Sequence, residues 1–425
     1  MSTSVQDRAA GVLRAIVKYY SGRDRDLTEV GRRLEMNSLH KSPINFLYTN
    51  IGRGHPFYLD GILECLPRES VGHVTDVFGV TSGSARQAWR LARFVYRGAA
   101  RGGMYSKVYS RMRGGNDFNR GGLMQAVMGR PLRKAYADDH APLVVAHPLL
   151  VAILKDKRNL IYQHGEVAAP RESWVKGGHL VLVPLPQTAD EFISRGFAKE
   201  RLFVSGLCIE PALVKEAEGA FSARLERLSS SESLCGAFIS SGAEPREHVA
   251  GLCAAALSAV AAGGRALIFA RRSGSLAAEA SREFAEKRQT LESVRTPSDL
   301  PGGMSRSLLC LYDERWELDE FTAKLFAELD YFVSPSHERT NWALSLGLPM
   351  FVVDPALGSF SPLNRQVLLD YSVARVIPDR SEAALFGATL TTLKRNGELR
   401  RMAEVCWGRF DMGGFENIAE MLQSV

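Results

Sequence analysis

A short glycine turn that carries one histidine is the first place in this chain where chemistry is expected. The apolar run Ile44–Tyr48 is typical of a buried strand, and it leads into Gly52, Arg53, Gly54 and His55. Glycines permit a tight turn, and the free N–H groups that open the next helix attract anions. A histidine there titrates near neutral pH and suits a general base or an anion contact. The turn predicts a ligand site, although such connections also occur for packing alone.

A second turn of the same kind follows the apolar run Leu234–Ile239. It contains Ser241 and Gly242, so hydroxyl and N–H groups are available to hold a phosphate. Arg271 ends the next predicted strand and is a candidate charge partner. An ordinary strand-to-helix connection is the alternative reading of this turn.

A third group of polar residues follows the predicted strand Tyr331–Val333. Its candidate ligand contacts are His337, Glu338, Thr340 and Asn341, with Asn364 in the next long loop. So many polar groups beyond strand ends exceed what packing requires, and they favour an anionic ligand.

The first half of the chain supplies one further candidate base. Glu166 follows the predicted strand Leu160–Gln163, so it lies, like His55, beyond a strand end. Trp174 is a candidate for lining an acceptor pocket. The chain has no HExxH pattern and no Cys/His cluster, so we expect no metal.

Positive charge is concentrated in residues 84–134, where twelve lysines and arginines face the single acid Asp117. Arg86, Arg90, Arg93 and Arg97 recur at helical spacing, with Trp89 and Phe94 among them. A basic, aromatic-rich helix suits anionic lipid headgroups. A solvated basic face and nucleic acid are the alternatives, and no recognisable nucleic-acid module accompanies the window.

Composition places the chain among ordinary globular proteins. It has 425 residues, of which 45% are hydrophobic and 24% charged, so two domains are expected. Six scattered cysteines favour a reducing compartment without disulfides. With no apolar run of about 18 residues, we expect a cytoplasmic protein, peripheral at most on the inner face of the plasma membrane.

Short β-rich runs alternate with helical ones from Ile44 onward, which predicts βαβ units and parallel sheets. The polar stretch Gly219–Ser233 is expected to connect two domains, at residues 1–218 and 233–408.

The order of these pieces resembles the two-domain GT-B glycosyltransferases. The likeness is to the branch with monogalactosyldiacylglycerol synthases, processive diacylglycerol glucosyltransferases and the peptidoglycan lipid-intermediate GlcNAc transferase. Four segments carry it: Ile51–His55 with Asp60–Ile62, Leu182–Glu210, Ser240–Ala243 and Ala343–Ile377. The resemblance implies an α/β fold with two Rossmann-like domains facing across a cleft. It also implies that a C-terminal helix, in residues 409–425, returns to the first domain.

The resemblance implies transfer of a sugar from a nucleoside diphosphate donor, expected to be UDP-linked, to a lipid or membrane-associated acceptor hydroxyl, without metal or cofactor. The donor contacts would be Ser241, Gly242, Arg271, His337, Glu338, Thr340, Asn341 and Asn364. His55 or Glu166 would deprotonate the acceptor, and Gly52, Arg53 and Gly54 would form the acceptor or phosphate turn. Trp342 stands where the family has a glutamate. The alternatives are a sugar-nucleotide epimerase and a non-catalytic module that binds sugar nucleotides or lipids.

Overall fold

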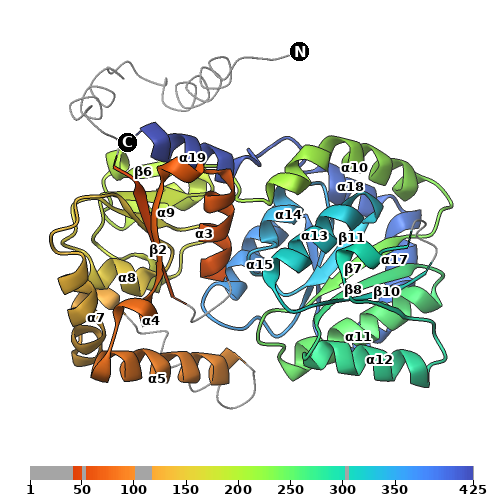
Figure 1. The fold of residues 1–425 in the computed structure, drawn as a ribbon. Coiled ribbons are helices and arrows are strands. Elements are labelled where there is room, and N and C mark those ends of the chain that lie inside the picture. The colour runs from red at the N-terminus through yellow and green to blue at the C-terminus, as the bar shows by residue number, and fades with distance from the viewer. Residues whose placement is uncertain (1–41, 50–53, 101–116, 302–305, 425) are drawn as a thin grey trace, which may run out of the picture.

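Two α/β lobes lie side by side in the computed structural model (Figure 1). The structure describes residues 42–49, 54–100, 117–301 and 306–424, and of residues 54, 55 and 96–100 the backbone alone. Each lobe is built on one parallel sheet, with six strands in the first and seven in the second. The predicted α/β class with two parallel sheets is therefore confirmed.

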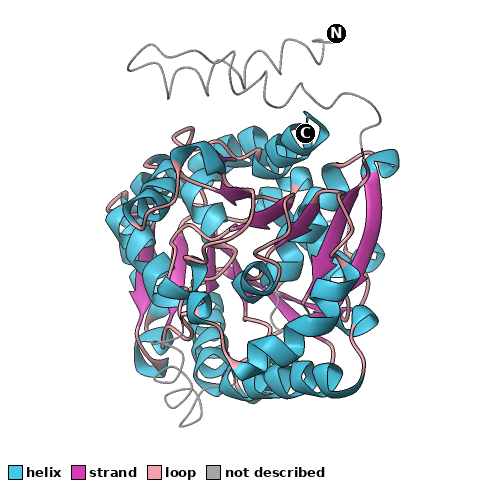
Figure 2. Cartoon of the chain, turned by 90° about the vertical axis from the view of Figure 1, so that its left-hand side faces the viewer, coloured by secondary structure: helices cyan, strands magenta, loops and turns pink. Residues whose placement is uncertain are grey.

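The first sheet has the strand order β2-β1-β3-β4-β5-β6. Its strands are β1 (Ile44–Tyr48), β2 (Val71–Asp76), β3 (Leu143–Val145), β4 (Leu160–Gln163), β5 (Leu180–Val183) and β6 (Leu202–Val204). The helices of this lobe are α3 (Gly54–Cys65), α4 (Val77–Val80), α5 (Gly83–Ala100), α7 (Leu123–Ala135), α8 (Pro148–Ile153) and α9 (Pro186–Ser194). Helices surround the strands (Figure 2), which is why the central strands are continuous apolar runs.

The second sheet has the order β13-β12-β11-β7-β8-β10-β9. Its strands are β7 (Cys235–Ile239), β8 (Arg265–Arg271), β9 (Glu292–Val294), β10 (Leu308–Tyr312), β11 (Tyr331–Ser334), β12 (Met350–Val353) and β13 (Ala374–Ile377). Its helices are α11 (Arg246–Ala261), α12 (Ser275–Glu286), α13 (Arg315–Leu325), α14 (Thr340–Ser345), α15 (Ser361–Asp370), α16 (Arg380–Ala384), α17 (Phe386–Arg395) and α18 (Glu398–Glu404).

The chain passes between the lobes through the long helix α10 (Pro211–Ser229). Most of the stretch Gly219–Ser233, expected to connect the two domains, is therefore helical. The reason is an apolar stripe that includes Phe221 and Leu228, which α10 buries against the second lobe.

The last helix, α19 (Gly414–Ser424), lies on the first lobe against α3 (Figure 1). The Phe415 ring makes an edge contact with Phe57, with ring centroids 5.4 Å apart. Gly61 makes this approach possible, because a Cβ there would lie 2.3 Å from the Phe415 ring. The end of the chain thus packs on the first lobe.

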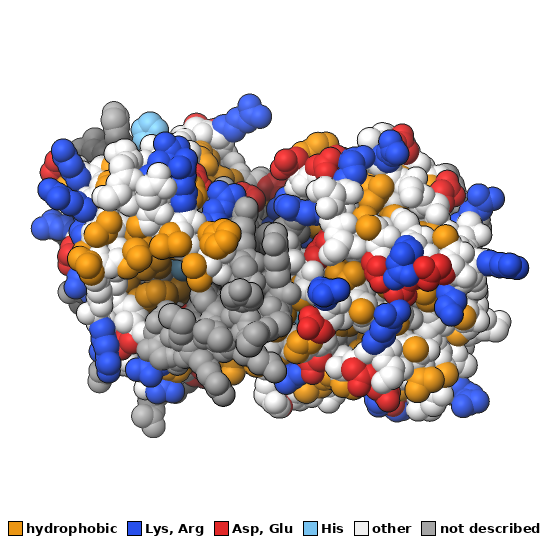
Figure 3. All heavy atoms as spheres, turned by 90° about the horizontal axis from the view of Figure 1, so that it is seen from below, with side chains coloured by type: hydrophobic (Ala, Val, Ile, Leu, Met, Phe, Trp, Pro, Cys, Tyr) orange, Lys and Arg blue, Asp and Glu red, His pale blue; other side chains and the backbone are white. Residues whose placement is uncertain are grey.

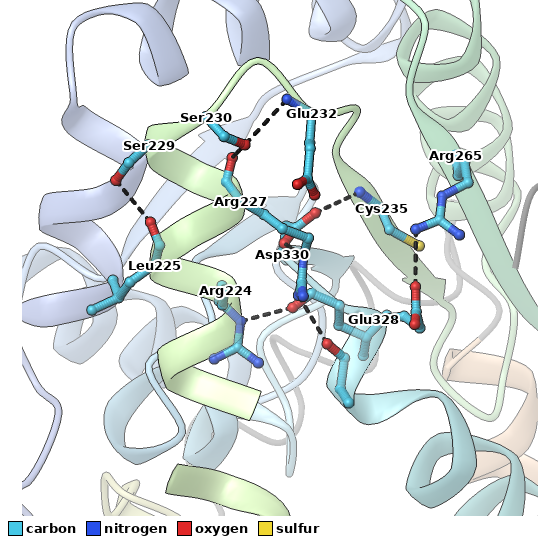
Figure 4. A network of polar contacts seen from close by, with 12 residues as sticks. Arg224, Leu225, Arg227, Ser229, Ser230, Glu232, Cys235, Arg265, Glu328 and Asp330 are labelled. Atoms are coloured by element: carbon cyan, nitrogen blue, oxygen red, sulfur yellow. Dashed lines mark hydrogen bonds and ion pairs between the residues drawn. The ribbon is translucent and has the colours of Figure 1, made fainter. Parts of the chain in front are cut away.

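A polar network joins α10 to the amino-terminal ends of the second sheet (Figure 4). Arg227 donates to Asp330 at 2.8 Å, and Arg265 donates to Glu328 at 3.0 Å. The buried Arg224 donates to backbone carbonyls, among them that of Leu329 at 2.7 Å. A shallow hollow beside these residues is lined by arginines that already have carboxylate partners, so we assign the network a structural role.

Candidate functional site

A small cavity lies where the strand order of the second sheet reverses, between β7 and β11. Open parallel sheets bind ligands at such a position, beyond the carboxyl ends of the strands. The turn after β7 contributes Ser240 and Ser241, and the turn after β11 contributes His337, Glu338 and Arg339. The cavity volume is about 10 Å³. Residues predicted from two distant parts of the sequence are thus brought together.

Other predicted donor contacts lie near the rim of this arrangement. Gly242 is exposed on the turn after β7, and Arg271 is exposed at the end of the neighbouring strand β8. Among the described residues no contact assigns a role to Gly242 or Arg271, so both stay predictions.

An ion pair dominates the electrostatics of the cavity. Arg339 Nη1 donates to Glu338 Oε1 at 3.2 Å. Burial by itself would raise the pKa of Glu338, but the charge of Arg339, with a smaller contribution from Arg315, lowers that pKa below its usual value, so the carboxylate is ionised. Burial lowers the pKa of His337, which keeps its ring neutral at pH 7.

The short helix α14 uses its polar side chains for packing rather than for the cavity. Asn341 Nδ2 donates to the Cys208 carbonyl at 2.9 Å, and Thr340 Oγ1 donates to the His337 carbonyl. Both side chains are buried. In this structure α14 turns both side chains toward the connecting segment and its own preceding turn, and the donor contacts expected of Thr340 and Asn341 stay predictions.

Trp342, which stands where the family has a glutamate, also ties α14 to the connecting segment. Its indole Nε1 donates to Glu210 Oε2 at 2.9 Å, and both residues are buried. Burial raises the pKa of Glu210, and the Trp342 hydrogen bond partly offsets this rise. The pair fixes one end of α14 relative to the first residues of α10.

Glu166 is held at the contact between the lobes. Asn364, at the buried face of α15, donates through Nδ2 to Glu166 Oε2 at 2.6 Å and to the Ser336 carbonyl at 3.3 Å. Burial, and then the charge of Glu338, raise the pKa of Glu166 to about 7, although the Asn364 bond lowers it. A carboxyl poised near neutrality can take up and release a proton, as a general base requires.

Tyr58 of α3 completes the surroundings of Glu166. Burial raises the pKa of its phenol, and the Glu166 charge raises it further. The ring lies directly against Gly165, where an added Cβ would approach it to 2.2 Å. The glycine before Glu166 therefore lets α3 come close to the loop after β4.

Several further contacts join the lobes near Glu166. Arg315 of α13 stacks over the Phe57 ring at 4.0 Å, and Gln187 Nε2 donates to the Tyr371 hydroxyl at 2.9 Å. Ser359 donates to Glu172 as well. One hydrophobic cluster contains residues of both lobes. Arg315, the first residue of α13, thus lies against the first lobe.

The histidine turn lies largely outside the described residues. Gly52 and Arg53 are not described, and Gly54 and His55 are described only as the first backbone positions of α3. Helix α3 begins at Gly54, so Pro56 lies in its first turn, where its missing N–H is tolerated. The roles assigned to these four residues stay predictions.

The basic helix α5 presents a mixed apolar and basic surface (Figure 3). Arg86 and Arg90 are exposed, as are Leu91, Phe94 (76% exposed) and Val95. Leu123 (82% exposed) and Met124 of α7 add to the exposed apolar side chains of this lobe. Figure 3 shows apolar and basic side chains in view together on this face.

Two residues of this surface differ from the prediction. Trp89 is fully buried and donates through its indole to the Met128 carbonyl at 3.3 Å. Arg93, one turn further on the same face, lies over the Phe78 ring at 5.6 Å. Both point inward because the helix face with Ala85 packs on the lobe. The Arg97 side chain lies outside the described residues.

Two residues of the site were not selected from the sequence. Arg339 lies inside the polar group after β11, so its charge was a usable signal. The sequence contains no such signal for Tyr58, because only the packing of α3 on Gly165 brings this residue to Glu166.

No group of three or more His, Cys, Asp or Glu side chains in the described part of the chain could hold a metal ion. Within the same residues, the helices lack the combination of length and apolar character needed to cross a bilayer.

Comparisons with known proteins place the fold. No family model and no curated protein sequence matches the chain. Among solved structures, a UDP-GlcNAc 2-epimerase from Neisseria meningitidis bound to UDP-GlcNAc matches with a TM-score of 0.53 and 11% identity, over 90% of this chain and 100% of that one. An S. aureus MnaA–UDP structure matches with a TM-score of 0.51 and 11% identity, over 90% and 98%. MurG from Acinetobacter baumannii matches with a TM-score of 0.47 and 12% identity, over 90% of this chain and 100% of that one. The chain has the two-domain GT-B fold.

Proposed function

We propose that this protein is a GT-B glycosyltransferase that moves a sugar from a nucleoside diphosphate, UDP-linked, to a hydroxyl of a lipid or membrane-associated acceptor. The observation that carries the proposal is Glu166, a carboxyl with its pKa raised to about 7 at the contact between the lobes. Glu338, which lines the second-lobe cavity, contributes to that rise. A base candidate near a turn suited to phosphate is what transfer to a hydroxyl requires.

In this proposal the second lobe binds the donor and the first activates the acceptor. Ser241 and the N–H groups of its turn hold the diphosphate, with Gly242 allowing close approach. Glu166 takes the proton of the acceptor hydroxyl, and His55 is the second candidate for that step. Oriented N–H dipoles stabilise the leaving diphosphate without a metal.

The mixed surface of α5 and α7 supports a membrane-bound acceptor. Exposed Phe94 and Leu123 would enter the interfacial region, while Arg86 and Arg90 would meet anionic headgroups. The protein is then peripheral on a cytoplasmic membrane face. This is a prediction of binding to a lipid surface, not to nucleic acid.

Vesicle flotation tests the membrane surface. We expect R86Q/R90Q to weaken binding to phosphatidylglycerol-containing vesicles by roughly fivefold per arginine, because each basic residue near an anionic surface contributes about 1 kcal/mol. The matched control is R282Q/R400Q, which neutralises two exposed arginines of the second lobe. Equal flotation of both double variants would remove the membrane surface from the proposal.

The epimerase is the second candidate, and the match to a UDP-GlcNAc 2-epimerase favours it. The non-catalytic module is the third, favoured by Asn341 and Trp342, which make packing contacts. Radiolabelled UDP-sugars with lipid vesicles separate the three. A lipid-linked product supports the transferase, a converted soluble sugar the epimerase, and binding without turnover the module.

A further inference from the structure

The cavity of the second lobe already contains a carboxylate of the chain itself. Glu338 and Arg339 both line it and are hydrogen-bonded to each other at 3.2 Å. Their side chains are 20% and 11% exposed, so the ion pair is largely withdrawn from water. A charge buried to this extent needs a partner. Glu338 is the carboxylate that accepts a hydrogen bond from Arg339, whose guanidinium also lies over the Trp342 ring at 5.3 Å.

The pair leaves hydrogen-bonding capacity unused. Among the described residues, Arg339 Nε and Ser240 Oγ are buried and make no hydrogen bond. Buried polar atoms are almost always paired, so unpartnered groups beside a cavity favour a ligand that supplies acceptors. A guanidinium binds phosphate oxygens through two parallel N–H groups, whereas Glu338 engages only Nη1.

The space is too small for a nucleotide while Glu338 remains there. The cavity volume is about 10 Å³, room for about one water molecule, whereas ligand pockets usually measure roughly 300–1,000 Å³. Glu338 lies in the turn after β11 and before α14, so it belongs to neither element. Rotating its side chain out would enlarge the cavity and free Arg339 at the same time.

We propose that Arg339 is the cation that binds the donor diphosphate, and that Glu338 is a resting counter-ion which the diphosphate displaces. This rests on the proposed function, in which the donor is a nucleoside diphosphate sugar. Exchanging one anion for another keeps Arg339 paired in both states, so no buried charge is left alone. Arg339 takes the role predicted for Arg271, and Glu338 gates the site instead of contacting the sugar.

Calorimetric titration with inorganic pyrophosphate tests the exchange. E338Q removes the competing charge with little change of shape, and we expect it to bind pyrophosphate roughly tenfold more tightly than the wild type. Adding R339Q in the E338Q background should weaken binding by roughly 100-fold, whereas R339K should recover part of it. E286Q and R282Q on the exposed face of α12 are the matched controls and should leave the affinity unchanged.

Each outcome decides the proposal. Equal affinity of wild type and E338Q, or no loss on adding R339Q, overturns it. E338Q/R339Q removes both charges and leaves no unpaired ion, so thermal unfolding of that variant identifies a folding defect. Measuring UDP-sugar turnover with the same preparations distinguishes failure of the anion exchange from failure of the proposed transferase function. If UDP-sugar is turned over but E338Q does not bind pyrophosphate more tightly, the exchange of Glu338 for diphosphate is overturned and the proposed function is not. If E338Q binds pyrophosphate more tightly but no UDP-sugar is turned over, the diphosphate site is supported and the transferase function is contradicted.

Discussion

At the scale of single residues, the proposed function makes Glu166 the group that determines how activity depends on pH. Its pKa of about 7 means that the deprotonated form, which a base requires, forms as pH rises through neutrality. We therefore expect kcat/KM, which reports the ionisation of the free enzyme, to rise from pH 6 to pH 8. Glu166→Gln should lower kcat by roughly 10²–10⁴-fold and remove that rise. A pH–rate profile of UDP-sugar turnover measures both, and an unchanged profile in the variant would exclude Glu166 as the base.

The raised pKa of Glu166 also predicts how the free energy of unfolding depends on pH. Its folded-state pKa of about 7 lies above the ordinary value of 4.5. Between these values the folded protein keeps a proton that the unfolded chain has released, so the free energy of unfolding falls as pH rises and levels off above pH 7. We expect Glu166→Gln to reduce this fall by on the order of 1–3 kcal/mol. Urea unfolding at pH 5 and pH 8 provides the comparison, and an equal fall in both proteins would contradict it.

Gly165 is predicted to be intolerant of a side chain. Gly165→Ala places a Cβ 2.2 Å from the Tyr58 ring, and we expect a loss of about 1–3 kcal/mol in the free energy of unfolding. Gly219→Ala is the matched control, because its Cβ would meet nothing within 4 Å on the exposed side of α10. That change should stabilise by about 0.5–1 kcal/mol, since glycine weakens a helix interior. Similar effects at both sites would mean that the Tyr58 contact carries no weight.

At the scale of elements, the position of α14 depends on Trp342 and Glu210. Trp342→Phe keeps an aromatic ring but leaves the buried carboxyl without its indole donor, so we expect a loss of about 1–3 kcal/mol. Glu210→Gln should lose less, because an amide oxygen still accepts. A double-mutant cycle in urea should give a coupling of about 0.5–3 kcal/mol between them. Additive losses would show that the hydrogen bond does not position α14.

The elements themselves were largely predictable from the sequence, whereas their orientations were not. Parallel strands buried on both faces are apolar runs, so β1, β4 and β10 were found with their observed bounds. The short edge strand β9 was missed, because Glu292–Val294 carries one apolar residue. Helical spacing located α5 but placed Arg93 outward, and the packing of the helix on Phe78 decided otherwise.

At the scale of the whole molecule, the sequence indicated two parallel sheets but not which residues meet across them. The hydrogen bond from Asn364 to Glu166 joins positions that are 198 residues apart, and no local pattern encodes it. Asn341 and Trp342 illustrate the converse. Asn341 is a candidate ligand group in sequence, and Trp342 stands where the family has a glutamate, yet the connection between the lobes takes up the polar atoms of both side chains. Strand order, by contrast, marks the site at the reversal between β7 and β11.

The central claim is that the second lobe binds a nucleoside diphosphate between the turns after β7 and β11, opposite Glu166. A crystal structure of the full chain with UDP tests it most directly. We predict diphosphate density between the turns after β7 and β11, with Arg339 on a phosphate and Glu338 rotated away. Absence of density there at saturating UDP, or density at the arginine network on the other end of the sheet, would contradict the account.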